Sequence, residues 1–159
     1  MKNHIILAGI PGTGKTTTGE YMSKHFGFSH YNFENETTFK LYAENKQKFI
    51  SHARRQSGVI ITWGFVPTKH IRNILSIQNR GFSLVWFDGD RAAAFREFTK
   101  RGTATDEMFY HQMIRIIKRK VVERLSPKII DPFDSLGQFR PLDELCKELI
   151  AYSARISFP

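Results

Sequence analysis

The sequence predicts a three-layer α/β/α fold, in which helices cover both faces of a five-stranded parallel sheet. Short apolar runs recur along the 159 residues, and stretches with helical spacing of apolar side chains separate them. Such alternation is typical of βαβ units and hence of a parallel sheet. The expected strands are the runs 5–8, 28–33, 59–63, 82–87 and 128–131. The length favours a single domain covering residues 1–159.

Apolar residues spaced three and four apart indicate the helices between these strands. We expect helices at about 15–26, 39–53, 68–79, 90–100, 105–125 and 142–152. Asp90, and either Thr105 or Asp106, are suited to cap the helices that they precede.

Basic residues outnumber acidic ones, with 24 Lys and Arg against 15 Asp and Glu and a formal net charge of +9. This excess favours anionic ligands, but it does not separate nucleotides from nucleic acid, and a merely soluble basic surface would give the same count. The single cysteine, Cys146, excludes an internal disulfide and is typical of a reducing cytoplasm. No stretch reaches membrane-spanning length. We therefore expect a cytoplasmic monomer or homodimer without a membrane partner.

A glycine-rich segment follows the first expected strand. Residues 9–16 read GIPGTGKT and match the phosphate-binding pattern G-x-x-x-x-G-K-[ST] at every fixed position. Gly9, Gly12 and Gly14 allow the backbone N–H groups to turn towards a phosphate. The helix that begins near Lys15 directs its positive dipole end at the same anion.

The side chains of this segment complete a nucleoside triphosphate site. Lys15 can reach the outer phosphates, and the Thr16 hydroxyl can ligate the Mg²⁺ that accompanies a nucleotide. We assign the neighbouring Thr13 and Thr17 to the same nucleotide site.

With this loop near its N-terminus and an arginine-rich helix pair in its second half, the chain resembles the small P-loop kinases. This group includes the nucleoside monophosphate, shikimate and gluconate kinases. The resemblance covers nearly the whole chain, although the phosphate loop is its one specific match. It implies ATP as the phosphoryl donor, Mg²⁺ as the cofactor and a small molecule as the acceptor.

Residues 31–34, YNFE, occupy the place where shikimate-kinase-like proteins carry an acidic D-x-D pair. There the second acid helps to hold magnesium and addresses the substrate hydroxyl, and the resemblance gives both roles to Glu34. Asn32 stands in place of the first acid. A carboxylate at the carboxyl end of a strand can face the γ-phosphate. Equally, Glu34 is favourable near a helix N-terminus for reasons of stability alone.

Residues 58–67, GVIITWGFVP, resemble the strand of adenylate kinases that ends in an acid followed by Gly-Phe-Pro. Gly64 and Phe65 match, whereas Trp63 stands where the acid would be. Either Glu34 or the Asp88/Asp90 pair then takes over the metal-binding role of this acid, or the protein does not catalyse the reaction. Trp63 is either a core residue or part of the acceptor pocket wall.

Two acids, Asp88 and Asp90, follow the fourth expected strand. One would cap the next helix, and the other could bind a substrate hydroxyl or hydrated Mg²⁺.

Residues 96–115 form the expected lid, a helix–loop–helix with a short loop. In the kinases that the chain resembles, this element closes over the triphosphate, and its arginines neutralise charge on the transferred phosphoryl group. The resemblance gives this role to Arg101 and Arg115. Residues 130–132, Ile-Asp-Pro, resemble the turn that seats the adenine base, so Asp131 and Pro132 complete the expected ATP site.

Three functions stay open on the sequence. The first is transfer of the γ-phosphoryl group of ATP to a hydroxyl or phosphate of a small metabolite. The second is phosphorylation of nucleic acid 5′ ends, because residues 100–103, KRGT, and the basic helix after them resemble polynucleotide kinases. The third is ATP binding without catalysis. The chain contains neither H-R-D nor D-F-G, which argues against a protein kinase, and it lacks the guanine-reading N-K-x-D motif.

Overall fold

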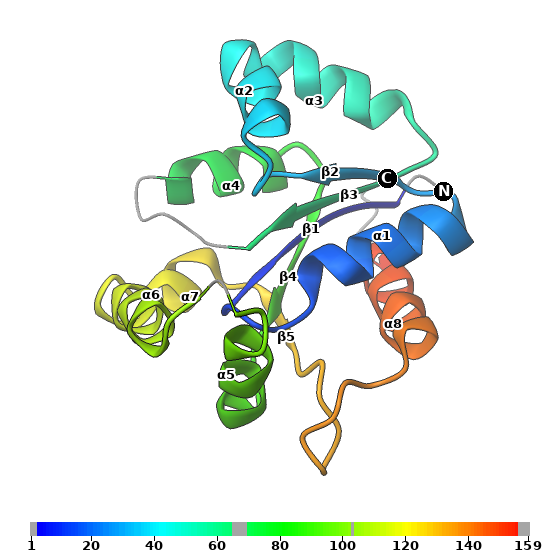
Figure 1. The fold of residues 1–159 in the computed structure, drawn as a ribbon. Coiled ribbons are helices and arrows are strands. Elements are labelled where there is room, and N and C mark those ends of the chain that lie inside the picture. The colour runs from blue at the N-terminus through cyan, green and yellow to red at the C-terminus, as the bar shows by residue number, and fades with distance from the viewer. Residues whose placement is uncertain (1–2, 65–69, 103, 156–159) are drawn as a thin grey trace.

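A computed structural model describes residues 3–64, 70–102 and 104–155. It contains a parallel sheet with the strand order β2-β3-β1-β4-β5 (Figure 1). The strands are β1 (Asn3–Gly9), β2 (Ser29–Asn32), β3 (Gly58–Trp63), β4 (Ser83–Phe87) and β5 (Lys128–Ile130). The predicted five-stranded parallel α/β fold is therefore confirmed.

Strand β1 lies at the centre of the sheet, between β3 and β4. In this register Ile5 pairs with Ile60 on one side and with Ser83 on the other. Central strands of a parallel sheet are buried on both faces, which explains why their sequences are continuous apolar runs. All the carboxyl ends of the strands point to one edge, where the phosphate loop follows β1.

Eight helices are present in the described residues and enclose the sheet (Figure 1). They are α1 (Lys15–Phe26), α2 (Glu36–Glu44), α3 (Lys46–Arg55), α4 (Ile71–Gln78), α5 (Arg91–Thr99), α6 (Asp106–Lys118), α7 (Val121–Leu125) and α8 (Leu142–Arg155). Helices α1 and α8 contact each other and the central strands on one face. Helices α4 and α7 pack together on the opposite face, where α5 and α6 extend the layer. None of the helices in the described part of the chain is long and apolar enough to cross a membrane.

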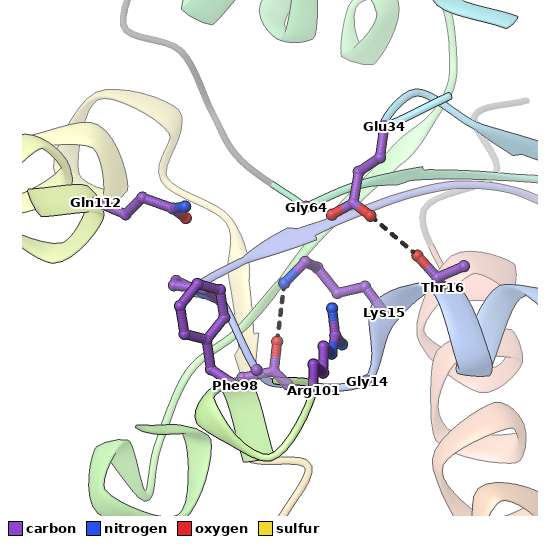
Figure 2. A pocket seen from close by; sticks show the side chains of 11 residues that line it. Gly14, Lys15, Thr16, Glu34, Gly64, Phe98, Arg101 and Gln112 are labelled. Carbon is purple, nitrogen blue, oxygen red and sulfur yellow. Dashed lines mark hydrogen bonds between the residues drawn. The ribbon is translucent and has the colours of Figure 1, made fainter. Parts of the chain in front are cut away.

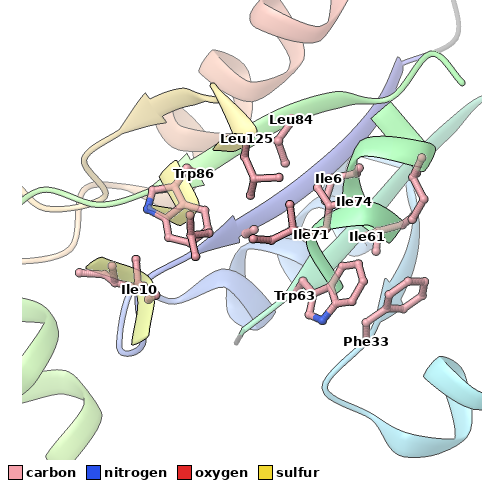
Figure 3. Packing of buried hydrophobic residues seen from close by; sticks show 14 of the residues in the cluster. Ile6, Ile10, Phe33, Ile61, Trp63, Ile71, Ile74, Leu84, Trp86 and Leu125 are labelled. Carbon is pink, nitrogen blue, oxygen red and sulfur yellow. The ribbon is translucent and has the colours of Figure 1, made fainter. Parts of the chain in front are cut away.

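The two faces of the sheet bury separate hydrophobic clusters. Ile6, Ile61 and Leu84 point into the larger one, which packs against α4, α7 and the α2–α3 pair (Figure 3). Their chain neighbours point to the other face, where α1 and α8 contribute Met22, Leu145 and the buried Cys146. The period of two along each strand thus assigns successive side chains to opposite layers.

Two predicted helices are each divided in the structure. The helix expected over 39–53 is wrong as a single element, because Asn45 ends α2 and caps α3, accepting from the Lys48 amide at 2.9 Å. The helix expected over 105–125 breaks at Lys120, whose φ of 50° is left-handed. This break turns Val121 and Leu125 into the core beside α4. The expected start of the helix at 68–79, Thr68, lies outside the described residues.

Candidate functional site

The loop between β1 and α1 is held against the carboxyl ends of two strands. The Ile10 amide donates to the Phe87 carbonyl at 3.0 Å, which fixes the loop beside β4. Gly12 has a φ of 77°, and a Cβ there would lie 2.0 Å from the Ala94 carbonyl oxygen. The loop therefore passes α5 at a distance that only glycine permits. Gly14, the N-cap residue of α1, has no side chain to cover the helix N-terminus, which stays open to an anion.

Lys15 is folded back onto the loop that carries it. Its Nζ donates to the Ile10 carbonyl at 2.5 Å and to Thr13 Oγ1 at 3.0 Å, and the residue is 5% exposed. Burial lowers the pKa of Lys15 from 10.5 to about 7, with Glu34 opposing the shift and Arg101 adding to it. The ammonium group thus takes the loop's own oxygens as partners while strongly desolvated. A phosphate oxygen would be a better partner because it brings a full negative charge.

Glu34 reaches the loop from the turn between β2 and α2. The Asn32 side chain accepts from the Glu34 amide at 2.9 Å, and the Phe33 amide donates to the Thr62 carbonyl at 2.9 Å. These two bonds hold the turn against β3 and leave the Glu34 side chain exposed at the sheet edge. Its Oε2 lies 3.4 Å from Thr16 Oγ1. Asn32, which stands in place of the first acid of the D-x-D pair, thus helps to position Glu34.

The Glu34 carboxylate covers the end of β3. A Cβ on Gly64 would lie 1.2 Å from Glu34 Oε1, so glycine at this position makes room for the carboxylate. Trp63, just before it, is 3% exposed and packs edge-on against Phe33 with ring centroids 5.2 Å apart. Trp63, the last residue of β3, is thus part of the core. The acid that lies at the end of this strand is Glu34, from the turn between β2 and α2.

A small cavity of about 80 Å³ joins these groups (Figure 2). It brings together most of the predicted loop residues with Glu34 and Arg101, although Arg101 is 67 residues further along the chain than Glu34. The residues that line it are Pro11, Gly12, Thr13, Gly14, Lys15, Thr16, Glu34, Gly64, Phe98, Arg101 and Gln112. Gly9 is the last residue of β1 and is not among these lining residues.

Arg115 lies exposed on α6 and is not among these lining residues. Gln112, one turn earlier, points into the cavity instead, and sequence reasoning missed it (Figure 2). The signal was present, because Gln112 falls on the same stripe of the helix as the buried Phe109, Met113 and Ile116. A polar side chain on an apolar stripe is a candidate for a site.

A second cavity, of about 350 Å³, shares Gly12, Gly14 and Arg101 with the first. Thr17 lines it together with Lys100, Arg101 and the ring of Phe139. Phe139 stacks on Phe133 with centroids 4.7 Å apart and is 42% exposed. Sequence reasoning missed Phe139 because nothing in its local pattern distinguishes it from an ordinary loop residue.

Asp131 and Pro132, which were expected to seat a base, line neither cavity. The Asp131 carboxylate accepts from the Phe133 amide at 2.9 Å and from the Asp90 amide at 3.2 Å. The Pro132 carbonyl accepts from the Arg140 amide at 2.9 Å. Both residues therefore hold the loop that carries Phe139.

The remaining acids near the site are engaged in structure. Asp90 caps α5 by accepting from the Ala93 amide at 2.9 Å, as predicted. Asp88 accepts from both Nε and Nη2 of Arg91, at 3.1 and 3.0 Å. In the described part of the chain, no three His, Cys, Asp or Glu residues form a candidate metal centre. Thr16 and Glu34 could still hold Mg²⁺, which commonly has one or two protein ligands and takes the others from phosphates and water.

Comparison with solved structures identifies the fold, whereas the sequence matches no protein-family model and no curated protein. The chain is similar to a sugar kinase from Janibacter sp., with 13% identity, a TM-score of 0.61 and complete coverage of both chains. It is similar to shikimate kinase from Acinetobacter baumannii, with 14% identity, a TM-score of 0.60, and coverage of 100% of this chain and 97% of that one. A gluconokinase from Sinorhizobium meliloti has 15% identity and a TM-score of 0.55, over 98% and 93% of the two chains. The chain therefore has the fold of the small P-loop kinases.

Proposed function

We propose that the protein is an ATP-dependent phosphotransferase that moves the γ-phosphoryl group of ATP to a small molecule. One observation carries this proposal. Lys15, Glu34 and Arg101 come from three distant segments and line a single cavity at the phosphate loop. A phosphate loop requires the lysine, whereas binding alone does not require a carboxylate and an arginine on the opposite sides of the same cavity.

The cationic groups would bind and orient the phosphates. Lys15 exchanges the Ile10 carbonyl and the Thr13 hydroxyl for phosphate oxygens, and the N-terminus of α1 supplies backbone amides. Arg101 approaches from the end of α5 and neutralises charge on the transferred group. Mg²⁺ held at Thr16 and Glu34 would supply further neutralisation of the phosphate oxygens.

Glu34 is proposed to accept the proton of the acceptor hydroxyl. In this step the hydroxyl oxygen bonds to the γ-phosphorus, and the bond from that phosphorus to the β–γ bridging oxygen breaks. The proton passes to the Glu34 carboxylate, and ADP leaves. The exposure of the carboxylate at the cavity edge allows an acceptor to approach it.

The second cavity is the proposed binding site for the adenine base of ATP. Its exposed Phe139 ring offers a stacking surface, and the adjoining Thr17 and Thr18 face it from α1. Residues 96–115, which include the end of α5 and most of α6, are the proposed lid of a single-domain enzyme. Closure of this lid would bring Arg115 nearer to the phosphates.

The test is release of ADP from ATP and Mg²⁺ in the presence of a panel of metabolites. We expect at least one acceptor to stimulate release and Lys15→Ala to abolish it, because the outer phosphates lose their cation. Lys24→Ala, on the exposed last turn of α1, is the matched control and should behave as wild type. Absence of stimulated release across the panel would count against the proposal.

ATP binding without catalysis is the main alternative, and the position of Trp63 in the core is consistent with it. Tight ATP binding with no turnover of any acceptor would favour this alternative. For a nucleic acid acceptor, the discriminating result is oligonucleotide affinity that falls steeply with salt.

A further inference from the structure

The cavity at the phosphate loop has two chemically different walls. Lys15 and Arg101 lie on the side of the loop and α5. Glu34 and Gln112 lie on opposite sides of the outer part, one from the β2–α2 turn and one from α6, and both side chains are directed inward (Figure 2). The outer part, where an acceptor would meet the phosphates, therefore offers a carboxylate and a carboxamide.

The cations of this cavity are committed to the donor. Lys15 and Arg101 are the only cationic side chains among its described lining residues, and both border the phosphate loop. A triphosphate would use both of them.

We infer that the acceptor is a neutral polyhydroxylated molecule, such as a sugar, a polyol or a nucleoside, rather than a carboxylate or a phosphate ester. This inference rests on the proposed kinase function and names its substrate class. A carboxamide carries both donors and acceptors, so Gln112 can bind a pair of neighbouring hydroxyls. The apolar ring of Phe98, in the same lining, suits the C–H face of such a molecule.

An anionic acceptor is disfavoured by the same groups. Its charge would need a cation of its own, and Lys15 and Arg101, the cations of the described lining, are used by the triphosphate. Specificity for the neutral class thus follows from an outer wall that, in the described residues, offers hydrogen bonds without an uncommitted cation.

The experiment uses pairs of acceptors that share a carbon skeleton and differ in one charged group. The pairs are glucose with gluconate, ribose with ribonate, and adenosine with AMP. Binding of ATP is measured first by calorimetry, and then ADP release and saturation-transfer NMR are measured for each acceptor. We expect turnover of at least one neutral member, with kcat/KM at least about tenfold lower for its charged counterpart.

A charge-introducing variant tests the role of Gln112 directly. Gln112→Lys places an ammonium on the outer wall and should shift the preference, measured as the ratio of kcat/KM within each pair, towards the charged member. His111→Lys adds the same charge on the exposed neighbouring position, outside the cavity lining, and should leave the preference unchanged.

The outcomes separate the inference from the proposed function. If ATP does not bind, the kinase function fails, and the inference fails with it. If ATP binds and charged acceptors are used in preference, the function stands and the inference is overturned. Binding of ATP with neither class bound or phosphorylated also overturns it.

Discussion

The Thr16 hydroxyl lies 3.4 Å from Oε2 of Glu34, across a strand that brings no acid of its own to the site. Thr16 lies in the first turn of α1, the helix after β1, and Glu34 follows β2, with β3 between these two strands. The two residues expected to hold Mg²⁺ are thus adjacent at the sheet edge. The Glu34 carboxylate lies over Gly64, next to Trp63, the residue in place of the acid expected at the end of β3.

Glu34→Gln should reduce turnover by about 10²–10⁴-fold, because the amide cannot accept the hydroxyl proton. The substitution preserves shape and lies on an exposed side chain, so the melting temperature should stay close to that of wild type. The measurements are kcat with the best acceptor and the ATP affinity by calorimetry. Glu36→Gln, also exposed and two residues along the chain, is the matched control and should retain full activity. Equal kcat values for Glu34→Gln and wild type would remove Glu34 from the mechanism.

Gly64→Ala should displace the Glu34 carboxylate without unfolding the protein. The added Cβ would meet the flexible end of a glutamate side chain, which can move into solvent. We therefore expect a loss of kcat similar to that of Glu34→Gln, and little further loss in the double variant Gly64→Ala/Glu34→Gln. Losses that multiply would show that Gly64 acts independently of Glu34.

The phosphate loop, the sheet and the position of Glu34 at the site edge could be reasoned from the sequence, because each depends on a local pattern. The loop matches a motif, and the strands are apolar runs with a period that fixes their faces. Glu34 could be placed because the carboxyl ends of parallel strands meet at one edge. The distance between Glu34 and Thr16, in contrast, depends on the strand order and on the Asn32 turn.

Gln112 and Phe139 were missed for two different reasons. Gln112 depends on how α6 packs, and an arginine one turn away was the more obvious partner for a phosphate. Phe139 depends on a loop whose shape is set by the Asp131 hydrogen bonds and by stacking on Phe133, neither of which has a sequence period. The helix breaks at Asn45 and Lys120 likewise follow from packing and capping rather than from apolar spacing.

Phe139→Ala should weaken ATP binding by about 1–3 kcal/mol, the usual value of stacking between a base and an aromatic ring. Affinity for inorganic tripolyphosphate should not change, because the phosphate loop is intact. Calorimetric titrations with ATP and with tripolyphosphate separate the contribution of the adenine base to affinity from that of the phosphates. Leu136→Ala, in the same loop and 79% exposed, is the control and should bind both ligands as wild type does. An equal loss for ATP and tripolyphosphate would place Phe139 outside the base site.

The lowered pKa of Lys15 predicts how stability depends on pH in the ligand-free protein. Between about pH 7 and 10.5 the unfolded chain retains the Lys15 proton, whereas the folded chain releases it. Because the unfolded state then binds more protons, the Lys15 contribution to the free energy of unfolding increases as pH rises through this window. Below pH 7 both states are protonated, and the destabilising burial of the charge remains in full. Urea unfolding of wild type and Lys15→Met across this range measures the contribution, which should be lost in the variant.

ATP binding should be coupled to uptake of a proton by Lys15. A phosphate beside the ammonium favours the charged form, so binding raises the pKa of Lys15 again and draws a proton from the buffer. At about pH 8.5 the uptake should approach one proton per nucleotide, and affinity should fall as pH increases further. Calorimetry in two buffers of different ionisation enthalpy gives the number of protons directly. In Lys15→Arg the guanidinium stays protonated throughout, so this variant should bind ATP without uptake. Equal uptake by wild type and Lys15→Arg would assign the proton to another group.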